Sequence, residues 1–253
     1  MGERGESGAG RLQLVLDAVL AVVLAPACAA CETPLEHPTS GPVCSACWRS
    51  ILPLTPPLCE RCGDPLPTWR VISLPLAICA RCRRTRSSVD LARAVGGYDG
   101  ALRSIVHALK YEGRRSLAVR LAAMMRERGA EVLTGATCVV PVPLYRSRHR
   151  ERGFNQAADL ARHLGLPVND ALRRVRATAT QTSLPAARRH ANVRNGFAVT
   201  RASRDLAGGV VVLIDDVCTT GATLDACARA LKGAGVAEVR ALTAARVAGR
   251  GRR

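Results

Sequence analysis

Aromatic residues are scarce in this 253-residue chain, which has two tryptophans, three tyrosines and two phenylalanines. Single-strand binders that work by base stacking depend on aromatic side chains, so a tight binder of that kind is not expected. The pattern GxxxxGK[ST] is absent, which excludes a P-loop nucleotide hydrolase. The longest apolar stretch, Leu12 to Ala25, contains Gln13 and Asp17 and is too short for a membrane span.

That apolar stretch has two interpretations. Basic residues precede it and Ala25-Pro26-Ala27 follows it, as in a signal peptide. Acidic residues in the leading segment and Asp17 inside the stretch argue against export. We therefore expect a helix that packs on the rest of a cytoplasmic protein, preceded by a loose terminus.

Lysine is also rare, because Lys110 and Lys232 are the only two among 37 basic residues. The formal net charge is +17, and the excess is uneven: residues 1–90 carry nine cations and eight acids, whereas residues 91–253 carry 28 and 12. The planar arginine side chain suits phosphate groups better than lysine does. The composition therefore favours a phosphate-bearing partner, either a nucleotide-like small molecule or a nucleic acid.

Eight of the eleven cysteines form four CxxC pairs, namely Cys28/Cys31, Cys44/Cys47, Cys59/Cys62 and Cys79/Cys82. Two such pairs supply a tetrahedral four-thiolate shell, so two structural Zn²⁺ ions are expected. Repetition of the pairs favours metal over a disulfide framework. We expect the first two pairs to bind one ion and the last two the other, although a cross-braced arrangement has the same spacing.

The chain divides at these cysteines. A tail and apolar helix (1–27) precede a double zinc ribbon (28–90) whose small core makes metal the main source of folding energy. This module is not especially basic, so docking of DNA-processing proteins is its more natural role than reading DNA. The remainder is an α/β domain (91–247) with a parallel-centred sheet, followed by a basic tail (248–253). Strands are predicted over 137–140, 209–214 and 239–247, and helices over 101–110, 116–128, 155–164 and 223–232.

The richest motif is VVVLIDDVCTTGATL, from Val210 to Leu224. An apolar strand leads to Asp215 and Asp216, and a short turn then opens a helix. Backbone N–H groups and a helix N-terminus favour a phosphate dianion, and Gly221 permits close approach. The two acids can accept hydrogen bonds from vicinal hydroxyls at the carboxyl end of the strand. A ribose 5-phosphate satisfies both ends.

This motif resembles the phosphoribosyl pyrophosphate (PRPP) site of type I phosphoribosyltransferases. The chain as a whole resembles the ComF family, which combines that fold with an N-terminal zinc ribbon and is associated with DNA uptake and natural transformation. The resemblance rests also on two further stretches, HALKYEGR from His107 and PVPLYRSRHRERGFNQA from Pro141, and on a spaced series from Arg176 to Phe197.

The resemblance implies roles for individual residues. Asp215 and Asp216 would hold the ribose hydroxyls, and the 5-phosphate would lie on Thr219, Thr220, Gly221, Ala222 and Thr223. The loop after Pro143 would take the pyrophosphate, with Arg146, Arg148, Arg150 and Arg152 nearby; in an extended loop these even-numbered residues would share one side. A flap over 173–197 would contain Arg176, Gln181, Arg188 and Asn192, of which Arg176, Arg188 or Asn192 would reach the leaving group, and Mg²⁺ would accompany PRPP.

One position departs from the pattern. Many phosphoribosyltransferases that act on nucleobases have an aspartate base where this chain has Thr219, and threonine cannot serve as that base near neutral pH. Three functions remain open: PRPP binding in DNA uptake, an active PRPP-dependent transferase in nucleotide salvage, and a single-stranded DNA-binding factor without turnover.

Overall fold

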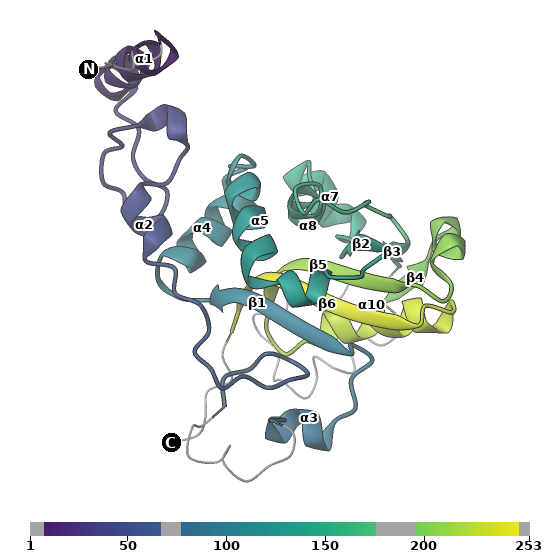
Figure 1. Cartoon of the computed structure of the whole chain (residues 1–253). Coiled ribbons are helices and arrows are strands. Elements are labelled where there is room, and N and C mark those ends of the chain that lie inside the picture. Colours follow the sequence, from purple (N-terminus) through teal and green to yellow (C-terminus); the bar gives the residue numbers. More distant parts are fainter. Residues whose placement is uncertain (1–7, 67–76, 176–195, 248–253) are drawn as a thin grey trace, which may run out of the picture. The chain divides into compact units, whose positions relative to one another are not determined.

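The computed structural model describes residues 8–66, 77–175 and 196–247 (Figure 1). The chain forms two compact units, the first made of residues 1–52 and 99–117 and the second of residues 53–98 and 118–253. The first two cysteine pairs therefore belong to one unit. The last two pairs belong to the unit that also contains the sheet.

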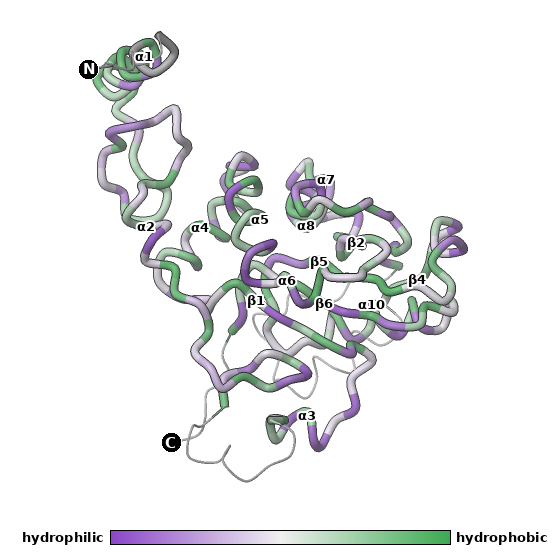
Figure 2. The backbone as a smooth tube through the Cα atoms, in the orientation of Figure 1, coloured by the Kyte–Doolittle hydropathy of each residue, from purple (hydrophilic) through white to green (hydrophobic). Residues whose placement is uncertain are grey.

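The first unit contains helices α1 (Gly8–Leu24), α2 (Ser45–Arg49) and α4 (Gly100–Tyr111) and the 3-10 helix η1 (Pro38–Ser40). Helix α1 confirms the helix predicted over the apolar stretch, and Figure 2 shows it to be mostly hydrophobic. The expectation that this helix packs on the rest of the protein is wrong, because apolar side chains such as Val15, Val19 and Val22 are exposed. Asp17 of α1 is buried and accepts a hydrogen bond from the Thr39 N–H at 2.8 Å. In the described residues, no helix is both long enough and apolar enough to traverse a bilayer.

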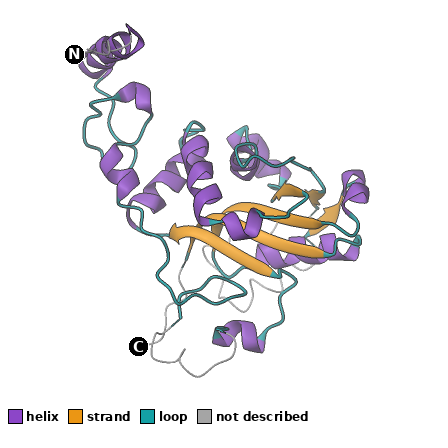
Figure 3. Ribbon diagram, viewed as in Figure 1, coloured by secondary structure: helices purple, strands orange, loops and turns teal. Residues whose placement is uncertain are grey.

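The second unit is built on a sheet of parallel strands in the order β1-β6-β5-β2 (Figure 3). Their bounds are β1 Leu91–Gly97, β2 Cys138–Pro141, β5 Val210–Cys218 and β6 Glu238–Arg246. A separate antiparallel hairpin pairs β3 (Leu172–Arg174) with β4 (Phe197–Val199). Among the described residues, the helices of the second unit are α3 (Ala80–Arg84), α5 (Leu117–Arg128), α6 (Ala130–Leu133), α7 (Arg146–Arg152), α8 (Gln156–Ala161), η3 (Arg201–Leu206) and α10 (Ala222–Gly233).

Strand β5 lies at the centre of the core. Residues 211–214 are fully buried, because β5 has a strand on each side and a helix on each face. Val211 and Leu213 pack with Leu231 of α10, and the alternation of a strand turns Val212 and Ile214 to the other face, where α8 contacts β5. The continuous apolar run thus encodes a strand buried on both faces, as the sequence predicts.

Strand β5 is longer than predicted. It continues past Ile214 to Cys218, because β6 pairs with it in parallel as far as Arg246. Asp215 and Asp216 therefore lie within the paired strand and not in a turn after it. Strand β1 and the β3–β4 hairpin were not among the predicted strands; β3 and β4 are short, and β1 ends in two glycines.

Candidate functional site

The two adjacent carboxylates of β5 differ in environment. Asp216 is buried with 3 % of its surface exposed, whereas Asp215 is half-buried. Successive side chains of a strand point to opposite faces, so the two carboxylates leave β5 in different directions. Val211 and Leu213 of β5 pack with α10, so the alternation of the strand turns Asp215 toward the same helix. Burial and, second to it, the Asp215 charge raise the pKa of Cys227 in α10. Its Oδ1 also accepts a hydrogen bond from the Asp216 N–H at 2.9 Å.

The predicted phosphate loop joins β5 directly to α10. Thr219 is exposed, Thr220 and Gly221 are half-buried, and α10 begins at Ala222. Gly221 precedes the helix with φ of +77°, a left-handed conformation that glycine adopts without strain. The Thr220 hydroxyl oxygen accepts a hydrogen bond from the Ala222 N–H at 3.4 Å. The local geometry is that of a helix N-terminus with its first amides directed out of the helix, as an anion site requires.

The segment after β2 comes next to Asp215 because β2 is the neighbour of β5. The Val142 N–H donates to the Ile214 carbonyl at 2.9 Å, one residue before Asp215. In open parallel sheets, ligands bind beyond the carboxyl ends of the strands. The structure therefore brings the predicted pyrophosphate segment and the predicted ribose carboxylates to one edge of the sheet.

The expectation of an extended segment with four arginines on one side is wrong. Residues 146–152 form helix α7, which ends at Gly153 with φ of +74°. Residues four apart share a helix face, so Arg148 and Arg152 form one pair and Arg146 and Arg150 the other. The first pair is half-buried and the second is exposed. Arg152 also donates to the Gln156 Oε1 atom at 3.1 Å.

Arg174 is a further candidate site residue, which the sequence analysis did not name. It ends β3, and its guanidinium carbon lies 5.4 Å from the centroid of the buried Phe197 ring. Burial lowers the pKa of Arg174, the Arg148 charge lowers it further, and the Asp215 charge raises it. These three charged side chains therefore share one electrostatic environment at the edge of the sheet. Arg174 lies within the range 173–197 predicted as a flap, but the sequence analysis did not single it out, because strand β3 was not predicted.

The predicted flap falls mostly outside the described residues. Arg176, Gln181, Arg188 and Asn192 all lie in the segment 176–195, which the structure does not describe. Its two flanks are β3 and β4, which pair with each other and lie against α10. The flap residues remain predictions from the resemblance.

The cysteines gather as the sequential arrangement predicts. Each group of four has its sulfur atoms within 4.8 Å of one another, and the groups are Cys28, Cys31, Cys44, Cys47 and Cys59, Cys62, Cys79, Cys82. A tetrahedral Zn²⁺ shell with bonds near 2.3 Å places its sulfur atoms about 3.8 Å apart. The Cys31–Cys44 and Cys62–Cys79 sulfur separations are 3.9 and 3.6 Å. Both clusters fit structural zinc.

The two clusters repeat one local structure. Within each, the second CxxC pair opens a short helix, α2 after Cys44 and α3 after Cys79. In the first cluster, the Cys47 backbone N–H donates a hydrogen bond to the Cys44 sulfur at 3.4 Å. In the second, the Cys82 backbone N–H donates to the Cys79 sulfur at 3.5 Å. Such N–H donors stabilise thiolates, which is the form that binds metal.

Comparison with known proteins supports both halves of this description. A phosphoribosyl transferase domain model matches residues 150–253, and a double zinc ribbon domain model matches residues 19–83. Competence protein F of Haemophilus influenzae is 31 % identical over 222 residues, which cover 84 % of this chain and 93 % of that protein. The chain belongs to the ComF family. Its fold is the phosphoribosyltransferase fold preceded by a double zinc ribbon.

Other ComF relatives are also similar over most of the chain. DNA utilization protein YhgH of Salmonella typhimurium is 35 % identical over 225 residues, covering 84 % of this chain and 93 % of the relative. Competence protein ComFC of Bacillus subtilis is 29 % identical over 196 residues, covering 75 % of this chain and 77 % of the relative.

Proposed function

We propose that this protein binds PRPP in the loop between β5 and α10 and acts in DNA uptake or DNA utilization in the cytoplasm. The relatives named for competence and DNA utilization support the biological role. Two clusters of reduced cysteines support a reducing compartment. One observation carries the chemical proposal: the half-buried Asp215 lies near the end of a central strand, and the turn that follows leads directly into the N-terminus of α10.

Each part of the ligand has a matching part of the site. Asp215 and Asp216 would accept hydrogen bonds from the ribose hydroxyls, with the larger share on Asp215 because it is more exposed. The loop from Thr219 to Thr223 would hold the 5-phosphate. Arg148 and Arg152 of α7 would meet the pyrophosphate, since they form the half-buried face of that helix. Mg²⁺ would neutralise the pyrophosphate, and carboxylate oxygens near the ribose are ligands that suit it.

Thr219 directs the proposal toward binding without nucleobase transfer. Its exposed hydroxyl can donate a hydrogen bond to phosphate, but it cannot remove a proton from a base near neutral pH. We therefore expect Mg²⁺-PRPP to bind and nucleobases not to react with it. A screen with radiolabelled PRPP and single nucleobases measures this; formation of a nucleotide would favour the transferase of nucleotide salvage instead.

Isothermal titration with Mg²⁺-PRPP tests the binding site. Wild type should bind, and Asp215→Asn should weaken binding about tenfold or more, because each hydrogen bond to a charged group contributes roughly 1.5–3 kcal/mol. Asp205→Asn, which removes one exposed acid of the same unit, is the matched control and should bind as wild type does. Absence of binding to wild type, or equal affinity in both variants, contradicts the proposal.

A second candidate function is binding of single-stranded DNA through its backbone. The exposed pair Arg146 and Arg150 on α7 favours it, because solvent-facing arginines can neutralise phosphates without stacking. The same helix would then serve two ligands, with its half-buried face toward PRPP and its exposed face toward DNA. We further propose that the zinc ribbon serves as a docking module for DNA-processing proteins.

A further inference from the structure

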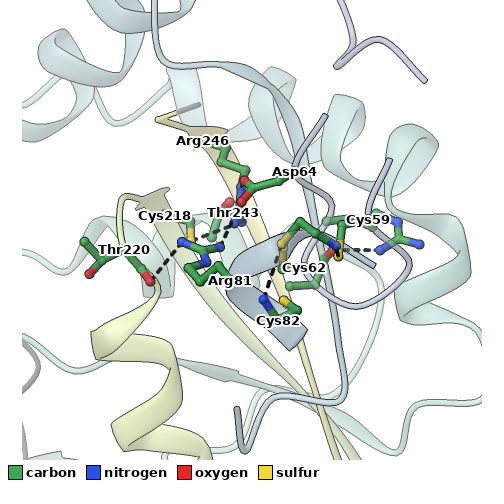
Figure 4. A network of polar contacts seen from close by, with 12 residues as sticks. Cys59, Cys62, Asp64, Arg81, Cys82, Cys218, Thr220, Thr243 and Arg246 are labelled. Atoms are coloured by element: carbon green, nitrogen blue, oxygen red, sulfur yellow. Dashed lines mark hydrogen bonds and ion pairs between the residues drawn. The ribbon is translucent and has the colours of Figure 1, made fainter. Parts of the chain in front are cut away.

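Residues next to both CxxC pairs of the second cysteine cluster belong to a network of polar contacts that includes Thr220 of the predicted phosphate loop, residues 219–223 (Figure 4). Asp64 follows Cys62 by two residues, and Arg81 stands immediately before Cys82. Two metal ligands, Cys79 and Cys82, therefore flank Arg81 on a helix of five residues. Metal bound at the cluster would fix the backbone from which both Asp64 and Arg81 project.

A continuous set of polar contacts joins this cluster to the loop. One terminal nitrogen of Arg81 donates to the Thr220 carbonyl oxygen at 3.3 Å, and the other donates to the Asp64 carboxylate at 3.0 Å. The second carboxylate oxygen of Asp64 accepts a hydrogen bond from Arg246. Arg246 in turn donates to the Cys218 sulfur at 3.3 Å. Asp64 thus couples the two arginines, which hold the loop at Cys218 and at Thr220.

The contact at Thr220 controls the direction of one amide of the loop. In a trans peptide group, the carbonyl of one residue and the N–H of the next point in opposite directions. Because Arg81 holds the Thr220 carbonyl on the ribbon side, the Gly221 N–H is directed away from the ribbon. Rotation of this peptide would turn a carbonyl oxygen to the anion side, where it would repel phosphate. Gly221 has the conformational freedom for such a rotation, so a contact from outside the loop is needed to keep the Thr220–Gly221 peptide in this orientation.

A second connection ties the ribbon to the start of α10. The Ser88 N–H and the Ser87 hydroxyl both donate to the Asp225 carboxylate, at 2.7 and 3.3 Å. Asp225 lies in the first turn of α10, and Arg229 binds its other oxygen at 3.1 Å. The segment that leaves the second cluster is therefore fixed to the same helix N-terminus that follows the loop.

We propose that Arg81 is a positioning residue for the phosphate loop and that metal occupancy of the second cysteine cluster sets the affinity of that loop for the phosphate of ribose 5-phosphate and PRPP. This proposal rests on the proposed PRPP function. Loss of metal from the second cluster releases Arg81 and Asp64, frees the Thr220–Gly221 peptide and weakens phosphate binding. The first cluster, whose cysteines belong to the other unit, has no such control.

The decisive variant is Arg81→Ala, with Arg83→Ala as its control. Both arginines lie on α3, neither is a metal ligand, and Arg83 is exposed. We expect Arg81→Ala to lower the affinity for ribose 5-phosphate and for Mg²⁺-PRPP about tenfold, the loss typical of one charge-assisted hydrogen bond. Its affinity for pyrophosphate alone and its zinc content should not change. A general folding defect would lower all three affinities, so this selectivity identifies positioning.

Two cysteine variants test the role of the metal. Cys82→Ser and Cys47→Ser should each lower the zinc content by about one ion. Only Cys82→Ser should lose affinity for ribose 5-phosphate, and amide exchange at Gly221 should become faster in that variant. Should Cys82→Ser fail to fold, the arginine pair decides alone. If wild type binds ribose 5-phosphate and Arg81→Ala binds it with the same affinity, this inference is wrong. If wild type does not bind PRPP, the proposed function is wrong instead.

Discussion

Gly63 lies so close to strand β1 that a Cβ atom on it would stand 2.8 Å from the carbonyl oxygen of Ala92. The neighbouring Arg61 carbonyl accepts a hydrogen bond from the Ala92 N–H at 2.7 Å. The first CxxC turn of the second cluster is therefore seated directly on the sheet. Gly63 also has φ of +69°, so both its backbone conformation and its lack of a side chain serve this contact.

Replacing Gly63 should destabilise the second unit more than replacing another glycine that has a similar positive φ. Gly63→Ala meets backbone strain and a clash with Ala92, whereas Gly208→Ala, at φ of +72° with no atom within 4 Å, meets the strain alone. We expect the first variant to be less stable than the second by about 1–3 kcal/mol, the usual cost of overpacking. Urea unfolding of the zinc-loaded proteins measures the difference. Equal stabilities would show that the turn can move away from β1.

Arg174 should matter for pyrophosphate, although the sequence analysis did not single it out. Arg174→Ala removes a guanidinium that lies over the Phe197 ring and whose pKa responds to the charges of Arg148 and Asp215. We expect the affinity for pyrophosphate to fall about tenfold, because a guanidinium can bind phosphate oxygens in pairs. Arg173→Ala is the control, since Arg173 is the exposed neighbour on β3. Similar affinities in the two variants would exclude Arg174 from the site.

The two faces of α7 should separate the two candidate ligands. Replacing Arg146 and Arg150 together by alanine should weaken oligonucleotide binding. It should also reduce the slope of log affinity against log salt concentration by roughly two, because each lost phosphate contact releases about one counterion fewer. Replacing Arg148 and Arg152 together should instead weaken Mg²⁺-PRPP binding. Fluorescence anisotropy across a salt series and calorimetry measure the two effects. If wild type binds no oligonucleotide even at low salt, the DNA proposal is wrong.

The hydrogen bond between Asp17 of α1 and Thr39 of η1 should stabilise the packing of these two helices, which belong to the same unit. The Thr39 N–H lowers the pKa of Asp17, as does His37 to a smaller extent, and burial opposes them. Because the folded-state pKa is lowered, the stabilisation is complete above the ordinary aspartate value of about 3.9 and is lost as pH falls through the folded value. Asp17→Ala should speed amide exchange at Thr39 at neutral pH. Asp17→Asn keeps an acceptor and should show a smaller effect, and unchanged exchange in both variants would contradict this role.

Zinc content provides a direct check of the cysteine clusters. Purified protein should contain about two zinc ions per chain, since each cluster supplies four thiolates. Prolonged chelation should remove both ions and lower the cooperativity of unfolding, because metal binding and folding are linked in small modules. A content of one ion or fewer in freshly prepared protein would contradict the double-ribbon assignment for this chain.

Local patterns in the sequence predicted much of this architecture. The CxxC spacing predicted two four-cysteine clusters, and the apolar run before Asp215 predicted a doubly buried strand. Helix α7 escaped prediction because its residues, Arg146 to Arg152, are all polar and carry no apolar periodicity. The extension of β5 through Cys218 depends on β6, a partner that lies later in the chain. Tertiary pairing of this kind overrides local preference.

Other features depend on distant parts of the chain meeting. Arg81 and Thr220 are 139 positions apart, and Asp64 and Arg246 are 182 apart. Neither pair has a spacing or pattern that marks it in a single sequence. The predicted boundary at residue 90 separates both pairs, although all four residues belong to the same compact unit.

The contact between Asp64 and Arg246 bears on how this protein can be shortened. Arg246 is 2 % exposed at the end of β6, and a fragment that starts at residue 91 would retain the entire sheet but lose the carboxylate that pairs with this cation. Removing one partner of such a pair typically costs about 3–5 kcal/mol, a large part of the stability of an ordinary domain. We expect such a fragment to aggregate on expression, and the shortest well-behaved version of the sheet to begin ahead of Cys59.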